Sequence, residues 1–154
     1  MAWSWVDGGD LATWPRPRLE IARRLIHRAT GENYPVERIR ELPLAEDWGR
    51  LILTDEDDRI GGIAWSMSLS SARIRLLAIM VDSALREQGH ASEAWERMRR
   101  GAVGEGHTEI QLEVREDNAR AIAMYERRGL EIQGRIQSYY RIEDGLLMLG
   151  PLDA

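Results

Sequence analysis

The chain has 154 residues, of which 44% are hydrophobic and 31% are charged, and its formal net charge is −5. A chain of this length favours one domain with a single core, and its acidic balance argues against binding to nucleic acid or to an anionic membrane surface. The absence of cysteine excludes disulfides and thiol nucleophiles, and three scattered histidines do not by themselves make a zinc site, so no metal is expected.

The first third of the chain predicts a short strand and two helices. It begins with "MAWSWVDGGDLATWPRP", in which "AWSWV" predicts a short edge strand. From Arg18 the apolar residues follow a helical spacing that ends at Thr30 and Gly31, and a shorter helix is predicted over 36–42. The start of the chain has no basic-then-apolar leader, and no apolar run reaches ~18 residues, so a cytoplasmic protein is expected.

The middle of the chain predicts a hairpin and a third strand. Arg50–Thr54 has the composition of a strand, and the acidic turn "DEDD" leads into a second strand at "RIGGIAWSMSL". A third strand is predicted over Arg73–Val81. A helix over about 90–100, a strand over Glu109–Arg115, a helix over 118–128 and a final pair of strands follow. This order predicts a mixed α/β sheet with helices on its faces.

A loop between the third strand and the next helix has the composition of an anion-binding site. In "VDSALREQGHASEAWERMRR", small residues at Gly89 and Ala91 open the helix and let a ligand approach the backbone. The first N–H groups of a helix have no partner within it, so they suit an anion such as a pyrophosphate. An ordinary strand-to-helix turn is the alternative.

The segment "LEVREDNARAIAMYERRGLE" places two ionisable side chains in unusual positions. Glu113 lies on the polar face of a strand whose other face is apolar. Tyr125 lies in the middle of a helix that Asn118 caps and Gly129 ends. The alternatives are a solvated carboxylate paired with an arginine for Glu113, and a core aromatic side chain for Tyr125.

Together, these two segments resemble the GCN5-related N-acetyltransferase (GNAT) superfamily. Residues 81–98 resemble its acetyl-CoA motif, and 112–131 resemble the ribosomal-protein alanine N-acetyltransferase (RimI-type) branch. "YYRIEDGLLM" is similar to a double tyrosine, acidic pair and closing methionine of that branch, although its "RI" loop is shorter than is typical. The resemblance implies one α/β domain over 1–154, a mixed and mostly antiparallel sheet flanked by helices. Its acceptor-side half covers about 1–72, and its acetyl-CoA-binding and catalytic half covers about 73–154.

The resemblance also implies a role for each matching residue. It makes Glu113 the proton acceptor and Tyr125 the proton donor, without a metal. The residues that it assigns to acetyl-CoA are Ile79, Met80 and Val81 for pantetheine, Arg86, Glu87, Gln88, Gly89, His90, Ala91 and Ser92 for the pyrophosphate, and Asn118 as a further contact. Tyr34, Tyr139 and Tyr140 are expected to bind the acceptor. The "YPV" that begins at Tyr34 is similar to a substrate-loop motif of N-terminal acetyltransferases, and the double tyrosine can donate hydroxyl hydrogen bonds to the carbonyls of an extended peptide.

The chemistry favours an α-amine as the acceptor. An amine must lose a proton before it attacks a thioester, and an α-amine has a pKa of about 8 against about 10.4 for lysine. We therefore expect acetyl transfer from acetyl-CoA to the N-terminus of a protein or peptide, by a monomer or a homodimer. The alternatives are acetylation of a small amine or amino acid, and a non-catalytic acyl-CoA-binding regulatory module.

Overall fold

The computed structural model describes residues 2–140 and 143–152, with the backbone alone at 138–140 and 143. Its helices and strands, in chain order, are β1 (Ser4–Asp7), η1 (Leu11–Thr13), α1 (Arg16–Thr30), α2 (Val36–Arg40), β2 (Arg50–Thr54), β3 (Ile60–Ser68), β4 (Arg73–Val81), η2 (Ser83–Leu85), α3 (His90–Gly104), β5 (Glu109–Arg115), α4 (Ala119–Arg127), β6 (Glu131–Tyr140) and β7 (Glu143–Pro151).

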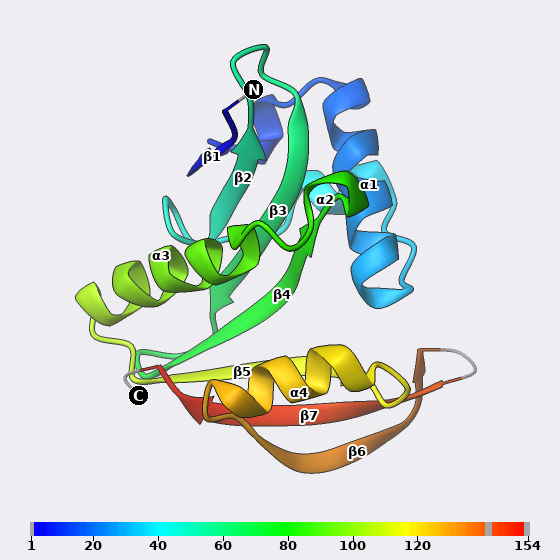
Figure 1. The fold of residues 1–154 in the computed structure, drawn as a ribbon, viewed down its shortest axis with the longest axis vertical. Helices are drawn as coiled ribbons and strands as arrows, with labels where there is room; N and C mark the ends of the chain where they lie inside the picture. The colour runs from blue at the N-terminus through cyan, green and yellow to red at the C-terminus, as the bar shows by residue number, and fades with distance from the viewer. Residues whose placement is uncertain (1, 141–142, 153–154) are drawn as a thin grey trace.

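Within the described ranges, seven strands form one sheet in the order β1-β2-β3-β4-β5-β7-β6 (Figure 1). Each pair of neighbouring strands is antiparallel except β4 and β5, which are parallel. A parallel pair requires a crossover, and here η2 and α3 provide it. The predicted mixed, mostly antiparallel sheet flanked by helices is confirmed.

Helices cover the two faces of the sheet. α1 and α2 pack on one face, where alternate β3 side chains such as Ile63 and Trp65 enter their hydrophobic core. α3 and α4 pack on the other face, above Ile74 and Leu76 of β4 and the apolar side of β5. The period-two alternation of strand side chains places the polar side of β5 on the face that carries α1.

The predicted elements agree closely with the structure, and α3 is the main exception. It continues to Gly104, whereas the sequence predicts its end near residue 100. Gly101 and Gly104 are poor helix formers, but a Cβ atom at Gly101 would lie 2.4 Å from the Cβ of Trp48. The close approach of the buried Trp48 side chain therefore stabilises a helical turn that local propensity disfavours.

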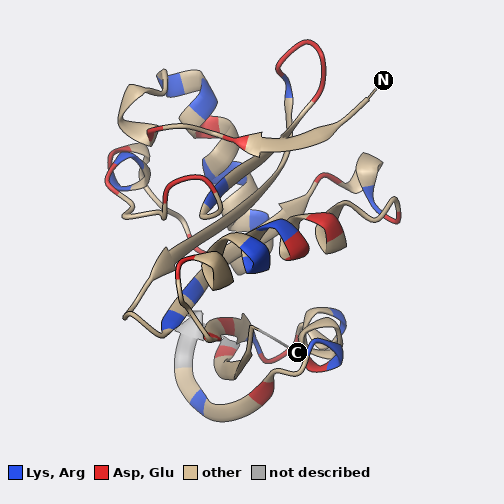
Figure 2. Cartoon of the chain, turned by 90° about the vertical axis from the view of Figure 1, so that its left-hand side faces the viewer, with Lys and Arg blue, Asp and Glu red and all other residues tan. Residues whose placement is uncertain are grey.

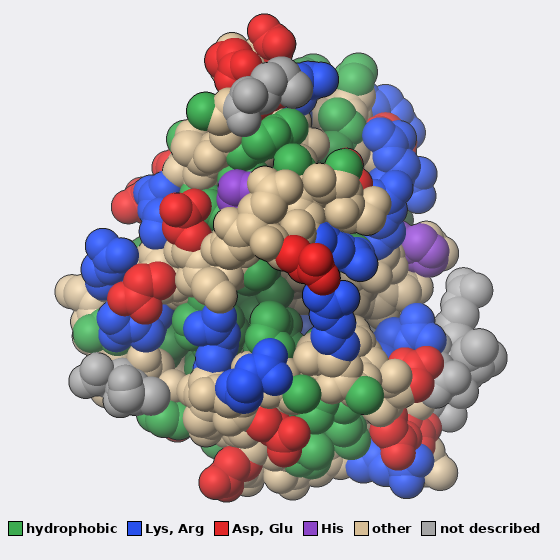
Figure 3. Space-filling view, in the orientation of Figure 1, with side chains coloured by type: hydrophobic (Ala, Val, Ile, Leu, Met, Phe, Trp, Pro, Cys, Tyr) green, Lys and Arg blue, Asp and Glu red, His purple; other side chains and the backbone are tan. Residues whose placement is uncertain are grey.

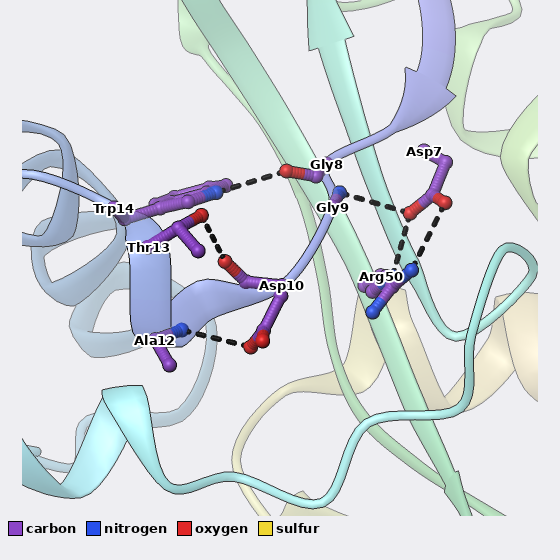
Figure 4. A network of polar contacts seen from close by, with 8 residues as sticks. All are labelled: Asp7, Gly8, Gly9, Asp10, Ala12, Thr13, Trp14 and Arg50. Carbon is purple, nitrogen blue, oxygen red and sulfur yellow. Dashed lines mark hydrogen bonds and ion pairs between the residues drawn. The ribbon is translucent and has the colours of Figure 1, made fainter.

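Polar contacts fix the N-terminal segment to the sheet (Figure 4). Trp14 donates its indole N–H to the Gly8 carbonyl at 2.9 Å. Asp7 accepts from Arg50 of β2 at 2.7 Å and from the Gly9 N–H at 3.0 Å. Asp10 caps η1 by accepting from the Ala12 N–H. This tryptophan-rich segment is thus an integral part of the domain. None of the helices in the described ranges has the length and apolar character needed to cross a bilayer.

Candidate active site

A cavity of about 460 Å³ opens where β4 and β5 part. The two parallel strands pair from Arg73 and Glu109 as far as Leu76 and Leu112. Beyond that point β4 stays paired with β3, while β5 stays paired with β7, so the two strands diverge (Figure 1). The cavity therefore lies between two halves of one sheet, and the end of α1, the start of α3 and α4 complete its walls.

The strand β4 presents an unpaired backbone edge to this cavity. Ile79, Met80 and Val81 pair with β3 on one side. On the side of β5, the described residues form no ladder beyond Leu76, and all three residues line the cavity. Backbone N–H and C=O groups on such an edge can pair with an amide-containing chain, as a further strand would.

The start of α3 forms another wall. Gly89 precedes the helix with φ 79°, in the left-handed region that suits glycine, and α3 has no side-chain cap. Glu87 also has a positive φ, of 64°. Trp5 of β1 donates its indole N–H to the His90 carbonyl at 2.9 Å, which ties the first turn of α3 to the edge of the sheet. The N–H groups of a first helical turn have no partner within the helix, so this turn is a candidate anion site.

Arginine side chains surround the cavity. Arg28 of α1, Arg86 of the loop, and Arg120 and Arg127 of α4 line it. Figure 3 shows basic side chains around a hollow whose floor is hydrophobic, whereas charges of both signs lie along α3 (Figure 2). A hydrophobic floor with a cationic rim suits a ligand that has an apolar arm and phosphate groups.

Glu113 extends from the polar face of β5 into this region. Its side chain is 10% exposed, and it pairs with Arg75 of β4. The Arg75 Nε atom donates to Glu113 Oε1 at 2.8 Å. The second carboxylate oxygen, Oε2, is buried and accepts no hydrogen bond from any described residue. A buried oxygen without a donor is costly, so this carboxylate is a candidate functional group.

Tyr125 of α4 lines the cavity from the other side of the cleft. Its side chain is 7% exposed, and its ring centroid lies 5.8 Å from that of Trp95 in α3. Burial raises the pKa of Tyr125 above its usual value of 10, although the Arg128 guanidinium acts in the opposite direction. The phenol therefore keeps its proton at neutral pH and is available as a donor.

Asn118 combines a structural contact with a place at the cavity. Its side-chain oxygen accepts from the Ala121 N–H at 3.2 Å, which confirms the predicted cap of α4. Asn118 also lines the cavity. Among the residues that the structure describes, no cluster of three or more histidine and acidic side chains is arranged to hold a metal ion.

The structure brings most of the predicted site residues to one cavity. Those that line it are Ile79, Met80, Val81, Arg86, Glu87, Gly89, His90, Ala91, Ser92, Glu113, Asn118 and Tyr125. Gln88 lies in the same loop with an exposed side chain.

The three tyrosines predicted to bind the acceptor are different. Tyr34 is 5% exposed and packs in the core beneath α1 and α2 rather than in the cavity wall. Tyr139 and Tyr140 end β6, but their side chains, like the "RI" loop at 141–142, lie outside the described part of the chain.

Sequence reasoning missed several residues at this site. Arg28 comes from the end of α1 and Arg120 from α4, and only the fold brings them together. Arg75 has a weak signal in the sequence, because Arg73 and Arg75 alternate with the apolar residues of β4. Such alternation predicts a polar strand face, but it does not identify the carboxylate that Arg75 pairs with.

Comparison with known proteins gives one family match and many similar structures. The family model described as the acetyltransferase (GNAT) family matches residues 19–130. No curated protein sequence matches the chain.

Three of the similar solved structures agree with this one over nearly the whole chain. Ard1 from Thermoplasma volcanium has a TM-score of 0.80 at 22% identity, covering 98% of each chain. The ribosomal-protein-S18-alanine N-acetyltransferase from Escherichia coli has a TM-score of 0.76 at 21% identity, covering 99% of this chain and 96% of that one. The NatC complex bound to Gag peptide and CoA has a TM-score of 0.77 at 20% identity, covering 98% and 99%. At these identities the likeness concerns the fold.

Proposed function

We propose that this chain, which belongs to the acetyltransferase (GNAT) family, transfers the acetyl group of acetyl-CoA to the α-amine at the N-terminus of a protein or peptide. The observation that carries this proposal is the meeting of Glu113, Tyr125 and the first turn of α3 at one cavity. A proton acceptor, a proton donor and an anion site are the groups that direct transfer from a phosphate-bearing thioester requires.

In this proposal acetyl-CoA lies along the gap between β4 and β5. Its pyrophosphate contacts the N–H groups from Gln88 to Ser92, and the arginines at the rim balance its charge. Its pantetheine arm pairs with the open backbone edge at Ile79, Met80 and Val81, with Asn118 as a further contact. The acetyl group then reaches the point where the two strands separate.

The reaction is a direct attack. Glu113, itself or through one water, takes a proton from the ammonium form of the acceptor, and the neutral nitrogen attacks the thioester carbonyl carbon. The new N–C bond forms, the C–S bond breaks, and Tyr125 donates its proton to the departing sulfur, so coenzyme A leaves as a thiol. The second proton that the nitrogen loses on becoming an amide restores the Tyr125 phenol, and Glu113 releases its proton to solvent. The buried phenol stays protonated until that step, because burial raises its pKa.

A peptide α-amine is the acceptor that we favour. The similar Escherichia coli enzyme is a ribosomal-protein-S18-alanine N-acetyltransferase, and the similar NatC complex is bound to a peptide and CoA. We place the entrance between residues 30–36 and the end of β6, where Tyr139 and Tyr140 would bind the peptide backbone. The lower pKa of an α-amine also makes it an easier substrate for a carboxylate base than lysine.

A small amine or amino acid is the second candidate. It is favoured by one observation: among the described residues of the first 72, only Arg28, Ala29 and Thr30 line the cavity, while Tyr34 is buried in the core. An acceptor site to which the first half of the chain contributes few side chains would suit a compact substrate.

A matched pair of peptides tests the acceptor. One has a free N-terminus and no lysine, and the other has a blocked N-terminus and one internal lysine. We expect the first to be acetylated faster by at least about tenfold, because its amine is deprotonated more readily. The measurement is thiol release from acetyl-CoA together with the mass of the peptide. Faster reaction of the blocked peptide would refute the proposal, and reaction of free amino acids or polyamines alone would select the second candidate.

A further inference from the structure

We infer that Arg75 is a positioning residue for the proposed reaction, holding the Glu113 carboxylate so that one of its oxygens faces the acceptor. This inference rests on the proposed function, since it assigns a second residue to the site of Glu113. Arg75 does not line the cavity among the described residues, so it acts through the carboxylate.

Arg75 contacts one of the two carboxylate oxygens of Glu113. Arg75 Nε donates to Glu113 Oε1 at 2.8 Å, and Arg75 Nη2 lies 2.8 Å from that same oxygen. These two of the three guanidinium nitrogens therefore converge on Oε1 instead of taking one oxygen each. Oε2 is buried and accepts no hydrogen bond within the described chain. The geometry leaves one oxygen occupied and the other ready for a proton.

The strand register explains why this pair lies at the site. Arg75 is paired with Gln111, and the next pair, Leu76 with Leu112, is the last one before β4 and β5 separate. Arg75 and Glu113 thus lie on the same face of the sheet and join the two strands at the point where the cavity begins. The side chains are 23% and 10% exposed, so water competes little for the contact.

The chain contains a matched control for this arrangement. Arg73 lies two residues earlier on the same face of β4 and joins the same two strands, donating to Glu109 and Gln111 at 3.1 Å each. It lies away from the cavity, and its side chain is 36% exposed. A merely structural role for an arginine between β4 and β5 would be shared by Arg73 and Arg75, whereas a role in positioning Glu113 belongs to Arg75 alone.

The experiment compares kcat and KM for wild type, Arg75→Met, Arg75→Lys, Arg73→Met, Glu113→Gln and the double variant R75M/E113Q, each with circular dichroism as a folding check. The acceptor is the amine that the wild type acetylates fastest, so that an error in acceptor class does not mask the result. We expect Arg75→Met to lower kcat by about 10²-fold, because small misplacements of a reacting group cost that much. The KM for acetyl-CoA and the kcat of Arg73→Met should each change by less than about twofold, since neither depends on the position of Glu113.

Two variants separate the possible outcomes. Arg75→Lys keeps a cation and a donor, so its kcat should be at least about tenfold higher than that of Arg75→Met. If Arg75→Met fails to fold, the kcat of Arg75→Lys is compared with that of the wild type instead. The double variant should be no slower than Glu113→Gln, because residues that act as a unit are not additive. The inference is overturned by wild-type turnover in Arg75→Met, by an equal loss in Arg73→Met, by a lysine variant no faster than the methionine variant, or by additive losses. Wild-type turnover in Glu113→Gln would instead overturn the assignment of the base, and the inference with it.

Discussion

At the scale of single residues, the site depends on ionisable side chains that are removed from water. Glu113 keeps one oxygen paired and the other buried without a donor among the described residues. Tyr125 is buried against Trp95, and burial raises the pKa of its phenol. Among the described residues, the nearby Arg128 guanidinium acts in the opposite direction. Ionisable groups in such surroundings gather at functional sites, which makes both side chains candidates for a chemical role.

The role of Tyr125 can be tested by removing only its hydroxyl. Tyr125→Phe keeps the ring that packs on Trp95, so the fold and the affinity for acetyl-CoA should be preserved. We expect kcat to fall by about 10²–10⁴-fold, the usual contribution of a general acid. Calorimetry of acetyl-CoA binding is the control. A folded variant that acetylates at the wild-type rate would remove Tyr125 from the mechanism.

At the scale of elements, the important feature is the separation of β4 and β5. Each strand keeps its outer partner, β3 or β7, so neither loses its place in the sheet when the inner ladder ends at Leu76 and Leu112. The start of α3 then lines one side of the gap, and the Tyr125 phenol of α4 lines the other. Arg128 joins these two helices, since its guanidinium donates to Ser92 Oγ at 3.0 Å and lies over the Trp95 ring.

The start of α3 can be tested with two glycines of the same geometry. Gly89 and Gly106 flank α3, both have positive φ, and a Cβ at either position would meet no atom within 4 Å. Gly89→Trp and Gly106→Trp should therefore carry a similar backbone strain, but only the first places a large ring where the pyrophosphate is proposed to bind. We expect the Kd for acetyl-CoA to rise by at least about tenfold in Gly89→Trp and to stay near the wild-type value in Gly106→Trp.

Calorimetric titration with acetyl-CoA measures this difference directly, and thermal unfolding of both variants shows whether the strain is indeed comparable. Equal affinities in Gly89→Trp and wild type would place the pyrophosphate elsewhere.

At the scale of the whole molecule, one sheet connects three hydrophobic clusters among the described residues. One lies beneath α1 and α2, one lies beneath α3 and α4, and a smaller one joins Trp5 of β1 to Ala94 of α3. Tyr34 lies in the first core, where burial, and secondly the nearby Glu32 carboxylate, raise its pKa to about 12. The ionised phenolate is thus disfavoured in the folded state relative to the unfolded chain, whose tyrosine has a pKa of about 10. Its contribution to stability is complete below pH 10 and is lost as the pH rises towards 12.

The free energy of unfolding should therefore fall between pH 10 and pH 12, by roughly 2 kcal/mol from Tyr34 alone. Tyr34→Phe should lose less over the same range, because phenylalanine has no proton to release. Urea denaturation followed by tryptophan fluorescence measures both proteins. Identical pH dependences would show that Tyr34 is solvated and that the first core is open at this position.

The sequence by itself determined the elements and twelve of the residues that line the cavity. Strands such as Arg50–Thr54, Arg73–Val81 and Glu109–Arg115 are found where their local patterns predict them, because alternation and turn residues act over a few positions. Family resemblance, confirmed by the GNAT family match, identified the loop that opens α3 and the pair Glu113 and Tyr125 as site residues, and their roles stay predictions.

Only the tertiary structure decided which distant residues come together. The pairing of Arg75 with Glu113 depends on strand register across 38 positions of sequence, and the burial of Tyr34 depends on how α1 and α2 pack on the sheet. The length of α3 depends on Trp48, which lies more than fifty residues before Gly101. These features arise from contacts between elements. A local sequence pattern contains no information about which elements meet, because packing energy is gained only when the whole sheet and its two layers of helices have formed.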